Sequence, residues 1–474
     1  MRWDQSLTRR QRLILLTLAF SVVSVISLLA WSIWATLGAA MASPIPTPPP
    51  TPASSPTPLP TADAPTEEDP APTPTPSPPS SPAFDVFRAG IISADVADAR
   101  RARAHLDTPL TLVDELDMSR ALYSHYKAQP ALAEKIIPIF QAMGLWEGKL
   151  PRINVVTQAE DVASLYAPES AELYLRRDWD GALSTIETQL AYGYAYAFTH
   201  GYGDLATLQA GAGSLDHQLA LAAVAKGDAV VSTWLLRAVM PAEPAEMPDA
   251  ASDILHDTAL AACPQWREDG GELLQAISCL DLDLGIAFAS SRYWSGGTAA
   301  MDAVVVRPPR STEQLLHPDR YSEVDEPRIL SPIVPVLDAA WSLTKTETLG
   351  EALMGLVIAG WSEGELGADA VTGWGGDLLQ VWDGPEGSKV VAWQMDWDDS
   401  RTAALFQGQL LELMPHALVK GLIRDTTPPA ALTRGRWWSG RQGTIFLYRR
   451  ANHVWLVWGD SPEAVEAVAV AALP

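Results

Sequence analysis

The chain has 474 residues, of which 47% are hydrophobic and 19% charged, and its formal net charge at pH 7 is -24. This many apolar residues can fill one or two buried cores, so a chain that is disordered throughout is excluded. The acidic balance excludes a general affinity for nucleic acid, because an anionic surface repels phosphates.

The first 42 residues predict a membrane anchor. Residues 13–42 carry no charged side chain and exceed the roughly 20 residues that a bilayer-spanning helix needs. Several arginines and one acid, Asp4, precede this segment, so the positive-inside rule places residues 1–12 in the cytoplasm and everything after residue 42 outside. A cleaved signal peptide is the alternative, because Ala40-Met41-Ala42 has the small-x-small form of a cleavage site.

Residues 43–83 predict a disordered linker. They consist largely of Pro, Thr, Ser and Ala, a composition that cannot form a core and that favours extended polyproline II. At ~3.1 Å per residue, such a segment would hold a folded part on the order of 100 Å from the membrane.

Residues 84–345 predict a mainly helical domain. Apolar residues recur with the helical period in five segments, namely 118–126, 131–146, 184–198, 215–239 and 271–291. Only residues 152–156 and 171–177 have the pattern of strands.

Residues 346–474 predict a small α+β region built on antiparallel hairpins. Strands are expected at residues 377–382 and 389–397, followed by a helix from Asp399. The same order recurs at residues 443–459, with a second helix from Ser461. The expected fold class for the chain is therefore α+β.

The chain contains two cysteines, Cys263 and Cys279. Outside the cell, two cysteines this close in sequence favour a disulfide over half of a metal site. Two buried, unpaired thiols remain the alternative, because sequence does not show whether the side chains meet.

The segment AYGYAYAFTHGYGDL (residues 191–205) resembles AHEYVHALQDQHFDL, a motif of uncharacterised secreted or membrane-anchored zincin-like metallopeptidases. Further segments resemble motifs of the same family: KGDA (226–229) its EGDA, PPRSTEQLLHPDRY (308–321) its PPxSTEQILHPxxY, and residues 349–351 and 373–377 its LGE and GWGGD. VASLYAPESAELYL (162–175) falls where the family has a strand. The resemblance covers roughly residues 110 to 470 and implies a zincin-like fold for the helical domain.

The resemblance also implies that the zinc site has been lost. Tyr192 and Tyr196 occupy the positions of the two histidines of HExxH, Gly193 that of the glutamate base, and Lys226 that of the third ligand. Phenols with a pKa near 10 are poor ligands, glycine cannot accept a proton, and an ammonium group repels a divalent cation. We therefore expect no zinc, no other cofactor and no peptidase chemistry.

Four other residues are candidates for a site. His200 and Asp204 lie four residues apart and could bind a cation with a distant third ligand, or they could serve only as helix-end residues. Glu313 and His317 could face a groove, or they could belong to a short helix that Ser311 caps and Pro318 ends.

RGRWWSGR (residues 434–441) runs against the acidic background. Arg434, Arg436 and Arg441 flank Trp437 and Trp438 and could hold an anionic polymer of the cell envelope. Alternatively, the tryptophans anchor the segment to the core.

Together these features predict a single-pass membrane protein with an extracytoplasmic, non-catalytic, zincin-like part that binds or scaffolds at the cell surface. The partner would be an envelope polymer or a protein. The alternative function is an active hydrolase, either with a rebuilt metal site or with another set of catalytic residues.

Overall fold

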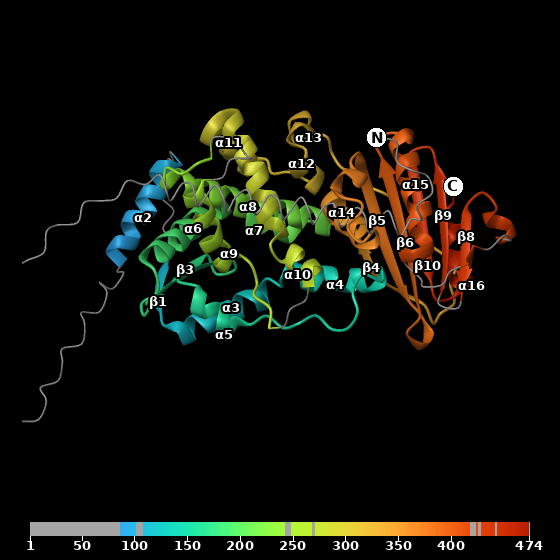
Figure 1. Cartoon of the computed structure of the whole chain (residues 1–474), viewed down its shortest axis with the longest axis horizontal. Coiled ribbons are helices and arrows are strands. Elements are labelled where there is room, and N and C mark those ends of the chain that lie inside the picture. The colour runs from blue at the N-terminus through green and yellow to red at the C-terminus, as the bar shows by residue number, and fades with distance from the viewer. Residues whose placement is uncertain are drawn as a thin grey trace, which may run out of the picture. The chain divides into compact units, whose positions relative to one another are not determined.

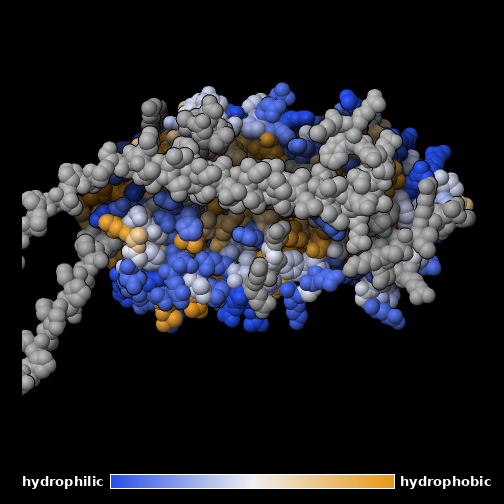
Figure 2. Space-filling view, viewed as in Figure 1, coloured by the Kyte–Doolittle hydropathy of each residue, from blue (hydrophilic) through white to orange (hydrophobic). Residues whose placement is uncertain are grey.

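The structure, a computed structural model, describes residues 86–100, 108–241, 248–267, 271–417, 423–424, 428–440 and 443–473. Residues 1–12, the expected anchor (13–42), the expected linker (43–83) and Arg441 lie outside these ranges. The described part has an α+β fold (Figure 1). Hydrophilic side chains cover much of its surface, with hydrophobic residues between them (Figure 2).

Up to residue 323 the chain is mainly helical. All five segments with helical periodicity form helices, but the segment 271–291 is divided at Cys279. The helices are α2 (Val86–Ala99), α3 (Glu115–Ala128), α4 (Leu132–Ala142), α5 (Val155–Asp161), α6 (Leu183–Tyr202), α7 (Leu205–Gly211), α8 (Leu215–Leu236), α9 (Asp249–Ala262), α10 (Gly271–Ser278), α11 (Leu280–Val306), α12 (Thr312–Leu316) and α13 (Pro318–Glu323).

The helix α8 is the centre of this part. Among the described residues it is the one helix of at least 18 residues that is apolar enough to cross a membrane, and 78% of its most apolar window is buried. It crosses α11 in direct backbone contact, because a Cβ on Gly227 would lie 2.0 Å from the carbonyl of Gly285. Its apolar character is therefore that of a core helix.

A small sheet packs beside α6. Its described strands β1 (Leu110–Val113), β3 (Glu172–Arg176) and β2 (Ser164–Ala167) lie in that order, with β1 parallel and β2 antiparallel to β3. The expected strand at 171–177 is β3. The expected strand at 152–156 is wrong: Ile153 forms only an isolated bridge, and Asn154 accepts a hydrogen bond from Thr157 N and starts α5.

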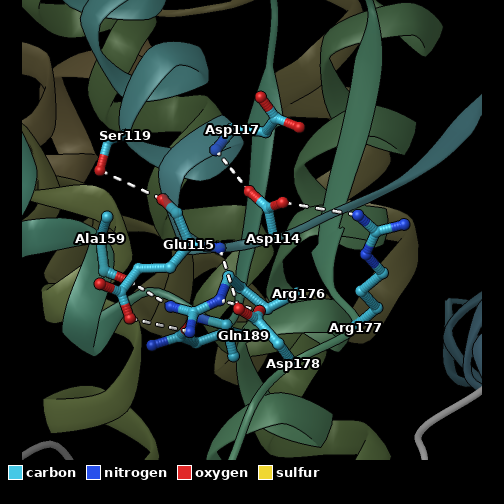
Figure 3. Close-up of polar contacts among 10 residues, drawn as sticks. Asp114, Glu115, Asp117, Ser119, Ala159, Arg176, Arg177, Asp178 and Gln189 are labelled. Carbon is cyan, nitrogen blue, oxygen red and sulfur yellow. Dashed lines mark hydrogen bonds and ion pairs between the residues drawn. The ribbon is translucent and has the colours of Figure 1, made fainter.

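Arg176 ties this sheet to two helices (Figure 3). Its buried guanidinium donates to Asp178 Oδ1 (2.6 Å), to the carbonyl of Ala159 in α5 (2.6 Å) and to Glu115 Oε2 in α3 (3.2 Å). Asp114 caps α3 by accepting from Asp117 N at 2.9 Å. These bonds fix α3, which carries part of the cavity wall described below.

Among the described residues from 342 onward, seven strands form an antiparallel sheet of order β4-β5-β6-β10-β9-β8-β7. Each predicted hairpin is present and is followed by a helix. The strands are β4 (Ser342–Glu347), β5 (Trp374–Asp383), β6 (Lys389–Trp397), β7 (Ile423–Arg424), β8 (Arg436–Gly440), β9 (Gly443–Arg450) and β10 (His453–Gly459). The helices are α14 (Gly350–Trp361), α15 (Ser400–Ala417) and α16 (Pro462–Ala472), with short 3-10 turns η1 (Ala368–Val371), η2 (Pro385–Gly387) and η3 (Ala430–Leu432).

The two faces of this sheet belong to different cores, because side chains alternate along each strand. On β6, Trp393 packs with α14 and α15, whereas Ala392 packs with α16. The α15 face also contacts the helical part, since Trp361 Nε1 donates to Met143 O and Trp458 Nε1 to Ala142 O, both at 3.0 Å.

The tryptophans of RGRWWSGR are buried in these cores. Trp437 is 6% exposed and packs on the α16 side, while Trp438 is 4% exposed and packs on the α15 side. Arg434 and Arg436 are exposed. The tryptophans therefore anchor β8 to the two cores. They present no aromatic surface with which an envelope polymer could be bound.

Candidate functional site

A cavity of about 370 Å³ lies in the helical part, between α6, α8 and the strand β2. Three of the four positions that the sequence assigns to the former zinc site line it together. The side chains that line the cavity include His125 on α3, Tyr166 on β2, Glu169 after β2, Tyr192, Tyr196 and His200 on α6, Lys226 on α8, and Asp281 on α11.

The two tyrosines lie one turn apart on α6. Their ring centroids are 5.9 Å apart, and the ring of Tyr166 meets Tyr196 edge-on at 5.4 Å. Burial raises the pKa of both the Tyr192 and the Tyr196 phenol. Both phenols therefore stay protonated and neutral at physiological pH.

The Tyr192 hydroxyl is unsatisfied. The residue is 5% exposed, and its buried OH has no hydrogen-bond partner in the part of the chain that the structure describes. A buried polar group without a partner destabilises a fold by about 1–3 kcal/mol. Tyr192 lines the cavity with its ring, and its buried hydroxyl stays unpaired among the described residues.

Lys226 is held in an ion pair that the sequence did not predict. Its Nζ lies 2.7 Å from Asp281 Oδ2 and donates to the carbonyl of Ala262 at 3.0 Å. Cys263 and Cys279 form a disulfide with a Cα–Cα distance of 5.4 Å, beside both partners of the lysine. Sequence reasoning missed Asp281, because its pairing with Lys226 joins two helices that are far apart in sequence.

Gly193, the fourth position, does not line the cavity. It is buried, and a Cβ built there would lie 2.6 Å from Leu173 Cδ1, a fully buried side chain of β3. A larger residue at Gly193 would therefore force Leu173 to move.

His200 and Asp204 have different surroundings, although the charge of Asp204 acts on the imidazole of His200. His200 lines the cavity with its Nδ1 3.3 Å from the Tyr166 hydroxyl, and burial lowers its pKa. Asp204 is exposed, has a left-handed φ of 49°, and precedes α7. A rebuilt metal site at this pair lacks a third ligand, since the group of His, Cys, Asp and Glu side chains found close enough for a metal among the described residues contains neither.

At the cavity wall His125 and Glu169 form a second polar pair, with Nδ1 and Oε2 3.0 Å apart. Burial opposes ionisation of Glu169, but the bond to His125 and its charge outweigh burial and lower the pKa of the carboxyl. These residues come from α3 and from the turn after β2, and no local sequence pattern connects them.

Glu313 and His317 lie elsewhere, at the junction of the helical part and the sheet. Glu313 is 2% exposed, and burial followed by the charges of Glu351 and Asp398 raises its pKa to about 8. His317 Nε2 lies 3.0 Å from Glu351 Oε1. Neither residue lines the cavity of Tyr192.

The LGE and GWGGD segments meet at the same junction through buried Asp377. Its carboxylate accepts from Leu349 N (3.1 Å), Gly350 N (2.9 Å), Trp374 Nε1 (3.1 Å) and Trp393 Nε1 (2.9 Å). Burial raises the pKa of Asp377, and the four donors oppose that rise. The carboxylate thereby satisfies the N-terminus of α14.

Gly350 is required for a close approach. It has a φ of 77°, and a Cβ there would lie 1.8 Å from Asp216 Oδ1. That oxygen accepts from Thr312 N (2.9 Å) and Thr312 Oγ1 (2.6 Å). As the sequence indicated, Ser311 caps α12 by accepting from Gln314 N, and α12 ends at Leu316 before Pro318.

A family model described as a domain of unknown function (DUF8575) matches residues 341–469, which run from the strand β4 into α16. The match includes Glu351 and Asp377 but no residue of the cavity. No curated protein and no solved structure matches the chain.

Proposed function

We propose that the chain is a membrane-anchored, extracytoplasmic, zincin-like protein that has lost its zinc site and binds a partner at the cell surface through the cavity of Tyr192. The observation that carries this proposal is the convergence of Tyr192, Tyr196 and Lys226, from two helices, on one cavity. An HExxH site with a third ligand on a later helix requires that arrangement.

Peptidase chemistry does not fit this cavity. Two neutral phenols replace the imidazole ligands, and an ammonium group paired with Asp281 lies where a third ligand would supply a negative charge. A cation placed there would be repelled by Lys226 and would lack a base at Gly193.

Binding fits it better. The walls combine aromatic rings, such as those of Tyr166 and Tyr196, with polar groups such as His125, Glu169 and His200. Gln129 and Pro130 line the cavity and are exposed, so it opens to the surface there. We infer that a polar segment of a partner protein enters at this point.

The N-terminal composition supports the location. The apolar segment 13–42 would anchor the chain, and the linker 43–83 would carry the cavity away from the bilayer. A disulfide between Cys263 and Cys279 suits an oxidising compartment.

The test is site-specific crosslinking in intact cells. A photoreactive phenylalanine at Gln129 should crosslink to a discrete partner, whereas the same group at exposed Glu363 should not give that product. Ala222 lines the cavity on α8, so Ala222→Phe fills part of it and should remove the crosslink.

Two results would reject the proposal. One is a crosslink from Gln129 that persists unchanged in the folded Ala222→Phe variant. The other is stoichiometric zinc in the dialysed full chain together with hydrolysis of a peptide library.

A further inference from the structure

Three carboxylates from separate segments meet at the junction of the helical part and the sheet. Glu313 lies on α12, Asp325 follows α13, and Asp398 lies between β6 and α15. Each offers an oxygen that lies within 4.8 Å of the oxygens offered by the other two. The distant sequence positions mean that the fold, not a local motif, creates this group.

The deepest of these carboxylates lacks a partner. Glu313 is 2% exposed, and its buried Oε1 accepts no hydrogen bond from any residue that the structure describes. Its neighbour Glu351 is 1% exposed, and its buried Oε2 also accepts no hydrogen bond from the described residues. A buried carboxylate is strongly disfavoured without a donor or a cation, so Glu313 either keeps its proton or exchanges it for a bound cation.

The arginines nearby do not supply it. Arg320 donates to Asp325 Oδ2 and to Asp398 Oδ2, both at 2.5 Å, but forms no hydrogen bond or ion pair with Glu313. Arg328 Nη2 approaches the other oxygen of Asp398 at 3.4 Å. The carboxyl groups at this junction therefore outnumber the guanidinium groups, and neither arginine pairs with Glu313.

We propose that Glu313, Asp325 and Asp398 bind one calcium ion. The three oxygens lie within 4.8 Å of one another, and oxygens that share one calcium ion lie at most about 4.6–5.2 Å apart, because each bond is about 2.3–2.6 Å. Calcium accepts irregular sets of carboxylates and water, whereas magnesium demands near-octahedral geometry and gives up its water reluctantly. The side chains of Asp325 and Asp398 are 37% and 22% exposed, so water can complete the coordination shell.

This site is separate from the cavity and does not depend on it. Bound calcium would join α12 and the segment after α13 to the turn that precedes α15. Asp398 lies in the segment that the family model matches, whereas Glu313 and Asp325 precede it. Calcium would thus stabilise the packing of the helical part against the sheet.

The test is calorimetric titration of the full chain, purified in mild detergent and freed of metal with a chelator. We expect one calcium per chain with a Kd of roughly 0.1–1 mM, the range of extracellular calcium modules, and no comparable magnesium binding. Calcium at about 10 mM should raise the melting temperature by roughly 2–4 °C.

The variants Glu313→Gln and Asp325→Asn keep the shape of each side chain but remove its charge. Loss of a side chain that only orients a metal ligand lowers metal affinity about 10–100-fold. Each of these variants loses the charge of a ligand itself, so it should bind calcium at least about tenfold more weakly. Glu323→Gln on α13 is the matched control, because Glu323 is exposed and outside the cluster. It should bind like the parent.

The proposal is overturned if the folded parent shows no calcium binding up to about 10 mM, well above the expected Kd. It is also overturned if Glu313→Gln and Asp325→Asn, with melting curves as cooperative as that of the parent, bind calcium as tightly as Glu323→Gln does.

Discussion

Replacing Asp377 with alanine should destabilise the junction of α14 and β5 severely. The change leaves four buried N–H donors without an acceptor: the amides of Leu349 and Gly350 and the indoles of Trp374 and Trp393. Each unpaired donor costs about 1–3 kcal/mol, so the expected loss is about 4 kcal/mol or more. That is a large fraction of the ~5–15 kcal/mol by which folded proteins are usually stable.

Urea unfolding followed by tryptophan emission measures this loss, since two of the donors are tryptophans. Asp377→Asn keeps one acceptor oxygen and should fall between parent and alanine variant. Asp338→Ala is the matched control, because Asp338 is exposed and its carboxylate accepts one hydrogen bond, from Ala340 N; it should change stability by less than about 0.5 kcal/mol. If Asp377→Ala is no more destabilising than Asp338→Ala, the proposed role of Asp377 is wrong.

Three further predictions concern the same fold. Burial raises the pKa of Asp216 to about 8 in the folded chain. Between about pH 5 and 8 the unfolded chain has lost this proton while the folded chain keeps it, so the free energy of unfolding should fall as pH rises through that range. Asp216→Asn should make that fall shallower by up to ~1.4 kcal/mol per pH unit in urea unfolding; an unchanged slope would refute this titration. Gly350→Ala should lower the melting temperature far more than Gly364→Ala, because both glycines have positive φ (77° and 81°) but only Gly350 abuts Asp216; equal effects would exclude the steric explanation. Alkylation without reductant should leave Cys263 and Cys279 unlabelled, and replacing both by serine should cost about 3 kcal/mol; labelling of both in the native protein would contradict the bridge.

The sequence predicted the helices and hairpins well because their signals are local. The apolar period alone places α6 and α8, and the turn residues place the hairpins β5–β6 and β9–β10. Ser461 accepts from Ala464 N and starts α16, as its position before Pro462 indicated. The strand expected at residues 152–156 failed because the N-cap Asn154 outweighs a short apolar run.

The candidate site was predictable only in part. The four-residue spacing places Tyr192 and Tyr196 on one side of α6, and the resemblance added Lys226. Asp281 could not be found, because its pairing with Lys226 depends on how α8 crosses α11. The acidic residues at the junction of the helical part and the sheet could not be grouped from the sequence for the same reason. Thr312 and Asp216, which form hydrogen bonds there, are 96 residues apart.

Zinc binding by a rebuilt site tests the central proposal most directly. The variant Tyr192→His/Tyr196→His/Lys226→Glu would present two imidazoles and a carboxylate to the cavity, and Gly193 stays unchanged because a side chain there would collide with Leu173. The matched control, Tyr194→His/Phe198→His/Lys226→Glu, places its histidines at the same spacing on α6 but at positions that do not line the cavity.

In competition with a weak chelator, the first variant should take up about one zinc per chain, while the parent and the control take up none. Failure of the folded first variant to bind zinc, or equal binding by the control, would contradict the assignment of this cavity as a former zinc site.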